Sequence, residues 1–137
     1  MWQHKESAVW TMFSKFIRAR DADDNGYCRC ISCGITKKWN DDMDAGHYIS
    51  KGSDSALKYD EYNVNAQCSF NCNRNKSGNL ILYRMGLVEK YGEEIVKKLE
   101  LAHKFKTTKK KMNQLELNVM YDLYSKKFKE QQKIKCL

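Results

Sequence analysis

The sequence predicts an α+β protein that is mostly helical, with a small zinc-stapled core between N-terminal and C-terminal helices. Three observations support this fold class. Apolar residues follow helical spacing at both ends of the chain, four cysteines form two close pairs in the middle, and short β-type stretches lie around those pairs. With 137 residues, 42% of them hydrophobic, the chain can bury a core of ordinary single-domain size.

The first helix is predicted over residues 3–20, where apolar side chains recur at spacings of three and four. The segment 21–26 is rich in aspartate and ends in glycine, which is typical of a turn and ends this helix. Two short β-type stretches are expected at 35–39 and 63–67, on either side of a polar loop. This middle region contains all the paired cysteines, as small metal-binding modules do.

Helical spacing returns after residue 73 and is interrupted by the lysine-rich segment 104–111. We therefore divide the chain into a domain of residues 1–104 and a basic helical extension of residues 105–137. The final helix either packs back on the body or pairs with a second copy of the chain, which would make a homodimer. Its apolar side is formed by Met112, Leu115, Val119 and Leu123.

The charge is concentrated in the C-terminal extension. The chain carries 25 basic and 17 acidic side chains, a formal net charge of +8, and residues 101–137 alone hold ten lysines against three acidic residues. Such a tail favours a polyanionic partner, for which DNA is our prediction, and a solvated helix face is the alternative. The three consecutive lysines Lys109, Lys110 and Lys111 are candidate DNA contacts.

No apolar run reaches 18 residues, and the N-terminus lacks the apolar stretch of a signal peptide. We therefore expect a soluble, cytoplasmic protein with no membrane partner. In such a reducing compartment cysteines hold metal more often than they form disulfides.

Two cysteine pairs have the spacing of a zinc site. Cys30 and Cys33 form a C-x-x-C-G turn, and Cys68 and Cys72 form a C-x-x-x-C pair further along. Two thiolates on one turn can face the same ion, and four thiolates complete a closed structural zinc site. Cys28 could replace Cys30 as a zinc ligand, but Cys28-Arg29-Cys30 is not followed by the glycine that is typical of such a cysteine turn.

Several strings together resemble one family. The order of a C-x-x-C turn, a strand ending in histidine, an asparagine and a second cysteine pair is similar to that of zinc-containing HNH nucleases. More closely, the chain from about Trp10 to about Glu100 resembles the NinG (Rap) recombination nucleases of lambda-type phages. The strings that carry this resemblance are Arg20–Asp23, Asp44–His47, Asn63–Val64, Gln67–Cys68 and Lys76–Leu80.

The resemblance implies a ββα-metal core and a phosphodiester hydrolase. His47 would be the general base, since an unperturbed imidazole has a pKa near neutral pH. Asp44 and Asn73 would hold one catalytic Mg²⁺ or Mn²⁺, because hard divalent cations take few protein ligands and prefer oxygen. Asn63 would fix the loop that orients His47. Two further side chains, Arg74 and Lys76, suit phosphate contact.

Two positions depart from the HNH pattern. The residue before the base is normally a metal ligand, but here it is Gly46, and the carboxylate of Asp44 lies three residues before the base. The last motif position is Asn73 instead of histidine, and Asn75 is an alternative ligand.

The predicted function is therefore a metal-dependent endonuclease that acts on DNA. The resemblance implies branched substrates of the Holliday-junction or D-loop type, in phage recombination within a bacterial cell. The alternative is a zinc-knuckle protein that binds DNA without cutting it. A scaffold that uses the last helix for protein contact would explain the tail but not the grouping of Asp44, His47 and Asn63.

Overall fold

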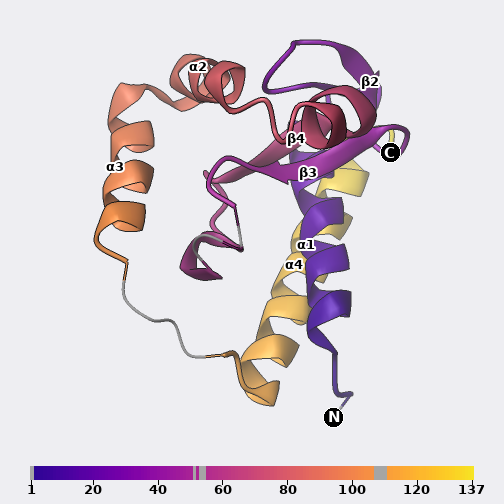
Figure 1. Ribbon diagram of the computed structural model, residues 1–137. Coiled ribbons are helices and arrows are strands. Elements are labelled where there is room, and N and C mark those ends of the chain that lie inside the picture. Colours follow the sequence, from indigo (N-terminus) through magenta and orange to yellow (C-terminus); the bar gives the residue numbers. More distant parts are fainter. Residues whose placement is uncertain (1, 51, 53–54, 107–110) are drawn as a thin grey trace.

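The computed structural model describes residues 2–50, 52, 55–106 and 111–137 (Figure 1). The predicted mixed, mostly helical fold is confirmed, and the first helix differs from its predicted range by three residues at the start and one at the end. Along the described residues the elements are α1 (Glu6–Asp21), β1 (Tyr27–Arg29), β2 (Thr36–Lys38), β3 (Met43–His47), η1 (Ser55–Leu57), β4 (Val64–Cys68), η2 (Ser69–Asn75), α2 (Leu80–Tyr91), α3 (Glu93–Lys104) and α4 (Gln114–Ile134).

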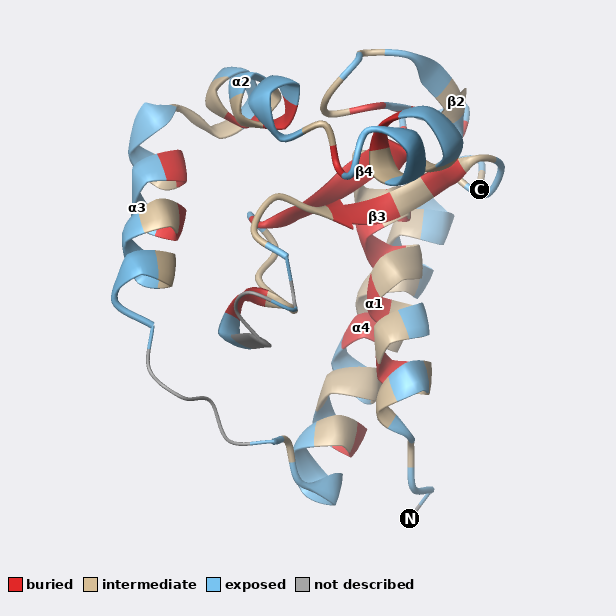
Figure 2. Ribbon diagram, viewed as in Figure 1, coloured by how far each residue is buried: buried red, intermediate tan, exposed pale blue. Residues whose placement is uncertain are grey.

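The antiparallel pair β3–β4 lies at the centre of the molecule. Its register runs from Met43 opposite Cys68 to His47 opposite Val64. All five residues of β4 are buried: α1 packs on one face of the strand pair, and side chains of α2 reach the other face (Figures 1 and 2). Val64 joins the cluster beneath α1, whereas the Asn65 side chain donates to the Tyr83 hydroxyl on α2. A strand covered on both faces loses its freedom to shift, so it fixes the positions of its neighbours.

Helix α4 packs lengthwise along α1 (Figure 1). Phe13 is fully buried and meets Tyr124 edge to face, with ring centroids 4.7 Å apart, and Met120 and Phe128 pack against the same cluster. Of the two arrangements expected for the final helix, this is the one in which it packs on the body.

The side of α4 that faces α1 is not the aliphatic side named from the sequence. Leu115, Val119 and Leu123 are 62%, 57% and 45% exposed. Tyr124 and Phe128, four residues apart, face inward instead, because each aromatic ring buries more apolar area than an aliphatic side chain. The aliphatic side therefore remains at the surface.

The chain after α4 is attached to the start of the β region. Lys135 Nζ donates to the carbonyl oxygens of Ala19 and Arg20, both at 2.9 Å, and so caps the C-terminal end of α1. The backbone N–H of Cys136 donates to Asp24 O at 3.0 Å. The division of the chain at residue 104 stays a prediction, although α4 shares a core with α1.

A second core lies between α2 and α3, where Tyr83, Leu87, Val96 and Leu99 are buried together. Helix α2 also approaches the first cysteine turn closely: a Cβ atom on Gly86 would overlap with the carbonyl oxygen of Ile31, so only glycine fits there. In the part of the chain that the structure describes, no helix is both long and apolar enough to cross a bilayer.

Replacing Phe13 with alanine should lower the free energy of unfolding by about 3–5 kcal/mol, because it opens a cavity between α1 and α4. Urea unfolding followed by circular dichroism measures this change. Leu101→Ala, at a 53% exposed position on α3, is the matched control and should change stability by less than about 0.5 kcal/mol. Equal effects of the two substitutions would contradict the packing of α4 on α1.

Candidate functional site

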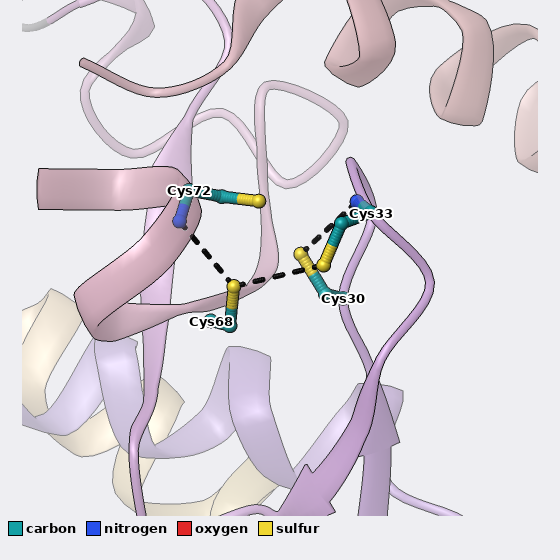
Figure 3. A group of neighbouring side chains, drawn as sticks. All are labelled: Cys30, Cys33, Cys68 and Cys72. Carbon is teal, nitrogen blue, oxygen red and sulfur yellow. Dashed lines mark hydrogen bonds between the residues drawn. The ribbon is translucent and has the colours of Figure 1, made fainter. Parts of the chain in front are cut away.

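Four cysteines from two segments converge, and they are the four predicted from their spacing (Figure 3). Cys30 and Cys33 lie in the turn between β1 and β2, Cys68 ends β4, and Cys72 lies in η2. Their sulfur atoms all lie within 4.8 Å of one another, and the Sγ atoms of Cys33 and Cys68 are 3.8 Å apart. A tetrahedron with Zn–S bonds of about 2.3 Å has edges of about 3.8 Å. The four side chains could therefore hold a zinc ion.

Backbone contacts fix the two cysteine turns against each other. The N–H of Ile31 donates to Ala66 O at 2.9 Å, which ties the first turn to β4. The N–H of Cys72 points at Cys68 Sγ, and Asn79 Nδ2 points at Cys72 Sγ, both at 3.4 Å. Burial raises the pKa of the Cys30 thiol, but backbone N–H groups directed at its sulfur lower it by more. Such donors favour the thiolate form that binds metal.

The two remaining cysteines lie outside this cluster. The Cys28 thiol donates to the carbonyl oxygen of Arg18 at 3.1 Å, and burial raises its pKa to about 12. Cys136 is exposed. The cluster therefore contains Cys30 and not Cys28, as the glycine after Cys33 predicts.

Three of the predicted active-site residues line one cavity of about 470 Å³ between α1 and β3. Asp44 and His47 come from β3, and Asn73 comes from η2. The Asp44 carboxylate accepts hydrogen bonds from Asn73 Nδ2 at 2.8 Å and from Ser69 Oγ at 2.7 Å. The fold thus places a carboxylate and an amide, both able to offer oxygen to a cation, beside an imidazole.

The imidazole of His47 is held from two sides. Its Nε2 lies 3.0 Å from the carbonyl oxygen of Lys58, which can only accept, so Nε2 donates. The neutral ring consequently carries its lone pair on Nδ1. The indole of Trp10 stacks on the ring, with centroids 5.0 Å apart and planes 19° apart. These contacts define the tautomer and the plane of the ring.

Asn63 is fully buried and ties together the loop that follows His47. Its Nδ2 donates to the carbonyl oxygens of Ile49 and Leu57 at 2.9 and 3.0 Å, and its Oδ1 accepts from the N–H of Ile49 at 2.8 Å. Since Leu57 directly precedes Lys58, these bonds also position the carbonyl that holds His47. Asn63 therefore makes contacts of the kind that the resemblance implies for a loop-fixing residue.

The structure gives a physical reason for glycine at position 46. A Cβ atom there would overlap with the Gln67 amide, which crosses from β4 and donates to Ser32 Oγ at 3.0 Å. The Gly46 carbonyl accepts from the Tyr83 hydroxyl at 2.6 Å. A side chain long enough to ligate metal has no room at this position, and the carboxylate that lines the cavity is that of Asp44 on the same strand.

The other predicted contacts lie at the surface or outside the described residues. Arg74 and Lys76 are exposed at the end of η2 and just after it, and Lys111 is exposed before α4. Lys109 and Lys110 lie outside the described residues. Asn75 is exposed and does not line the cavity, so Asn73 is the asparagine that the fold brings to Asp44.

The sequence did not single out Trp10 and Arg18, which line this cavity from α1, or Ser69, which donates to Asp44 from the start of η2. Helical spacing places Arg18 on a different side of α1 from the buried Phe13 and Ile17, but nothing in the sequence indicates what that side faces. Burial lowers the pKa of the Arg18 guanidinium, and the carboxylate of Asp44 opposes this shift.

Fold and site together define a small α+β protein with a four-cysteine cluster beside a polar cavity. The profile of a family described as Bacteriophage Lambda NinG protein matches residues 2–134, and the chain belongs to this family. The predicted family is thereby confirmed, while membership of the HNH superfamily stays a prediction.

Curated relatives agree with this assignment. The chain is 42% identical over 90 residues to protein ninG of Escherichia phage 933W, covering 64% of this chain and 40% of the relative. It is 43% identical over 91 residues to protein ninG of Salmonella phage P22 (65% and 40%) and 41% identical over 90 residues to that of Escherichia phage lambda (64% and 40%). The chain thus matches about two fifths of the length of these relatives. No solved structure matches it.

We expect the purified protein to contain one zinc ion per chain, and Cys72→Ser to lose it, because three thiolates leave a tetrahedral site open. Elemental analysis measures the zinc content, and thermal unfolding should show a lower midpoint for this variant. Cys28→Ala and Cys136→Ser are the matched controls and should keep the metal. Wild-type zinc content in Cys72→Ser would refute the site.

Proposed function

We propose that this protein is a metal-dependent DNA endonuclease that hydrolyses phosphodiester bonds. The observation that carries the proposal is the meeting of Asp44, His47 and Asn73 in one cavity, although Asn73 lies 26 residues after His47. Hydrolysis of a phosphodiester requires an activated water, stabilisation of charge on the phosphate and assistance to the leaving oxygen. A histidine, a carboxylate and an amide in one cavity can together supply or support these three requirements of hydrolysis.

In this proposal His47 is the general base. Its Nε2–H is fixed by the Lys58 carbonyl, so Nδ1 accepts the proton of the attacking water. Stacking on Trp10 keeps the ring in one plane, which preserves the direction of that lone pair. Asn63 acts as a positioning residue, since it holds the loop that carries the Lys58 carbonyl.

Asp44 and Asn73 would hold one Mg²⁺ or Mn²⁺. Their hydrogen bond of 2.8 Å shows that the two side chains reach the same point, and their oxygens are of the type that hard cations prefer. Such an ion would stabilise negative charge on the phosphate and the leaving oxygen. The order of β3, β4 and η2, two antiparallel strands followed by a helical segment, supports the proposal of an HNH-like ββα-metal unit. The zinc cluster would hold η2 against β4.

DNA is the substrate that we propose, and branched DNA follows from the resemblance to the phage recombination nucleases. Arg74, Lys76 and Lys111 are exposed and could contact phosphates without reading the bases. Affinity should therefore fall steeply as salt rises.

With zinc-loaded protein and branched DNA, His47→Ala should reduce the rate of cleavage by about 10²–10⁴-fold, because the general base is lost. The matched control is His4→Ala: His4 stacks on Tyr121, and it does not line the cavity. Single-turnover cleavage is measured with Mg²⁺ or Mn²⁺, without either ion, and after the ion is restored.

Equal cleavage by wild type and His47→Ala would exclude His47 as the base. Binding of DNA by wild type with no cleavage under any of these conditions would favour the alternative, a zinc-knuckle protein that binds without cutting.

We also propose that the chain forms a homodimer on branched DNA, since two symmetric cuts need two active sites. The exposed aliphatic side of α4 would make the contact. Leu115→Lys combined with Val119→Lys should then convert the dimer to a monomer in sedimentation equilibrium, whereas Leu101→Lys, exposed on α3, should not. A wild-type protein that is monomeric both free and on branched DNA would contradict the dimer.

A further inference from the structure

Arg18 presents a cation to the cavity that contains Asp44 and His47. Its side chain is held along its length: Nε donates to Ser14 O at 3.2 Å, Nη1 donates to Trp39 O at 3.1 Å, and the guanidinium lies over the Trp39 ring, 5.5 Å from the centroid. A guanidinium restrained in this way loses little further freedom when it binds a ligand.

Among the residues that the structure describes, Arg18 forms no ion pair within 4 Å, and its Nη2 donates to no protein acceptor. Asp44 lines the same cavity, but its carboxylate oxygens accept from Asn73 and Ser69 instead. Partly buried cations are normally paired, because burial makes an isolated charge costly. An anionic ligand between Arg18 and the side chains of β3 and η2 would supply the missing partner.

We propose that Arg18 binds the phosphate at which DNA is cut, through its uncommitted Nη2. This inference rests on the proposed nuclease function and adds to it the group that holds the reacting phosphate. The planar guanidinium suits phosphate oxygens, and its position on α1 places it across the cavity from the β3 and η2 residues. A phosphate bound there would lie beside both the base His47 and the proposed cation ligands Asp44 and Asn73.

Arg18 could instead serve only to tie the Trp39 carbonyl to α1. Arg18→Met keeps a side chain of similar length over the Trp39 ring but removes the charge and the donors. Arg18→Lys keeps the charge and loses the planar donor geometry. Lys15→Met is the matched control. It removes one positive charge from the same helix, and Lys15 does not line the cavity.

The first measurement is single-turnover cleavage of branched DNA with Mg²⁺. We expect a reduction of about 100-fold or more for Arg18→Met, a smaller one for Arg18→Lys, and less than about threefold for Lys15→Met. The second is ¹⁵N NMR of the Arg18 Nε resonance in wild type, assigned by its absence in Arg18→Lys. Thymidine 3′,5′-bisphosphate, added without divalent metal, should shift this resonance, and thymidine should not.

The two measurements separate the inference from the function on which it rests. Cleavage by Arg18→Met at the wild-type rate, or no shift of the Arg18 resonance with the bisphosphate, overturns the role of Arg18 even if wild type cuts DNA. A specific shift with no cleavage by wild type supports the phosphate site and refutes the nuclease proposal. If Arg18→Met fails to fold, the NMR titration of wild type and cleavage by Arg18→Lys still decide the question.

Discussion

The burial of β4 on both faces is the constraint on which the rest of the structure depends. Cys68 at its end takes part in the cysteine cluster, and Asn63 directly before its start fixes the loop that holds His47. The Asn65 amide oxygen accepts from Arg20, Lys90 and Tyr91 on α1 and α2. Since buried polar groups need partners, these bonds leave β4 one position and one register. The cavity is built from the neighbours of β4, and the cysteine cluster includes its last residue, Cys68.

The polar contacts around Asp21 reinforce this arrangement. Its carboxylate accepts from Arg20, from Lys90 at 2.8 Å and from the N–H of Ala66 at 2.9 Å, so it joins α1, α2 and β4. Burial raises the pKa of Asp21, but Arg20 and Lys90 lower it by more. The stabilisation is therefore present above the unfolded-state value of about 4 and is lost as the pH falls through the lower folded-state pKa.

Zinc and the proposed catalysis would be linked through η2. Cys72 belongs to the cysteine cluster, and the next residue, Asn73, bonds Asp44 across the cavity. An ion that fixes Cys72 would thereby also fix Asn73. Arg18 and Trp10 approach from α1, which is itself held by α4 through Phe13 and Tyr124. The cavity thus depends on helices from both ends of the chain.

The sequence by itself determined the first helix and the two cysteine pairs, and its resemblance to the phage family supplied the candidate residues Asp44, His47, Asn63 and Asn73. Helical spacing and the spacing within each cysteine pair reflect contacts between residues that are close along the chain. A family motif preserves the order of its residues, so it can also be recognised without the structure. Only the tertiary structure decided which side of α4 faces α1, why position 46 is glycine and that Arg18 reaches the cavity. Each of these depends on a residue from another segment, Phe13, Gln67 or Asp44, and no local pattern contains that partner.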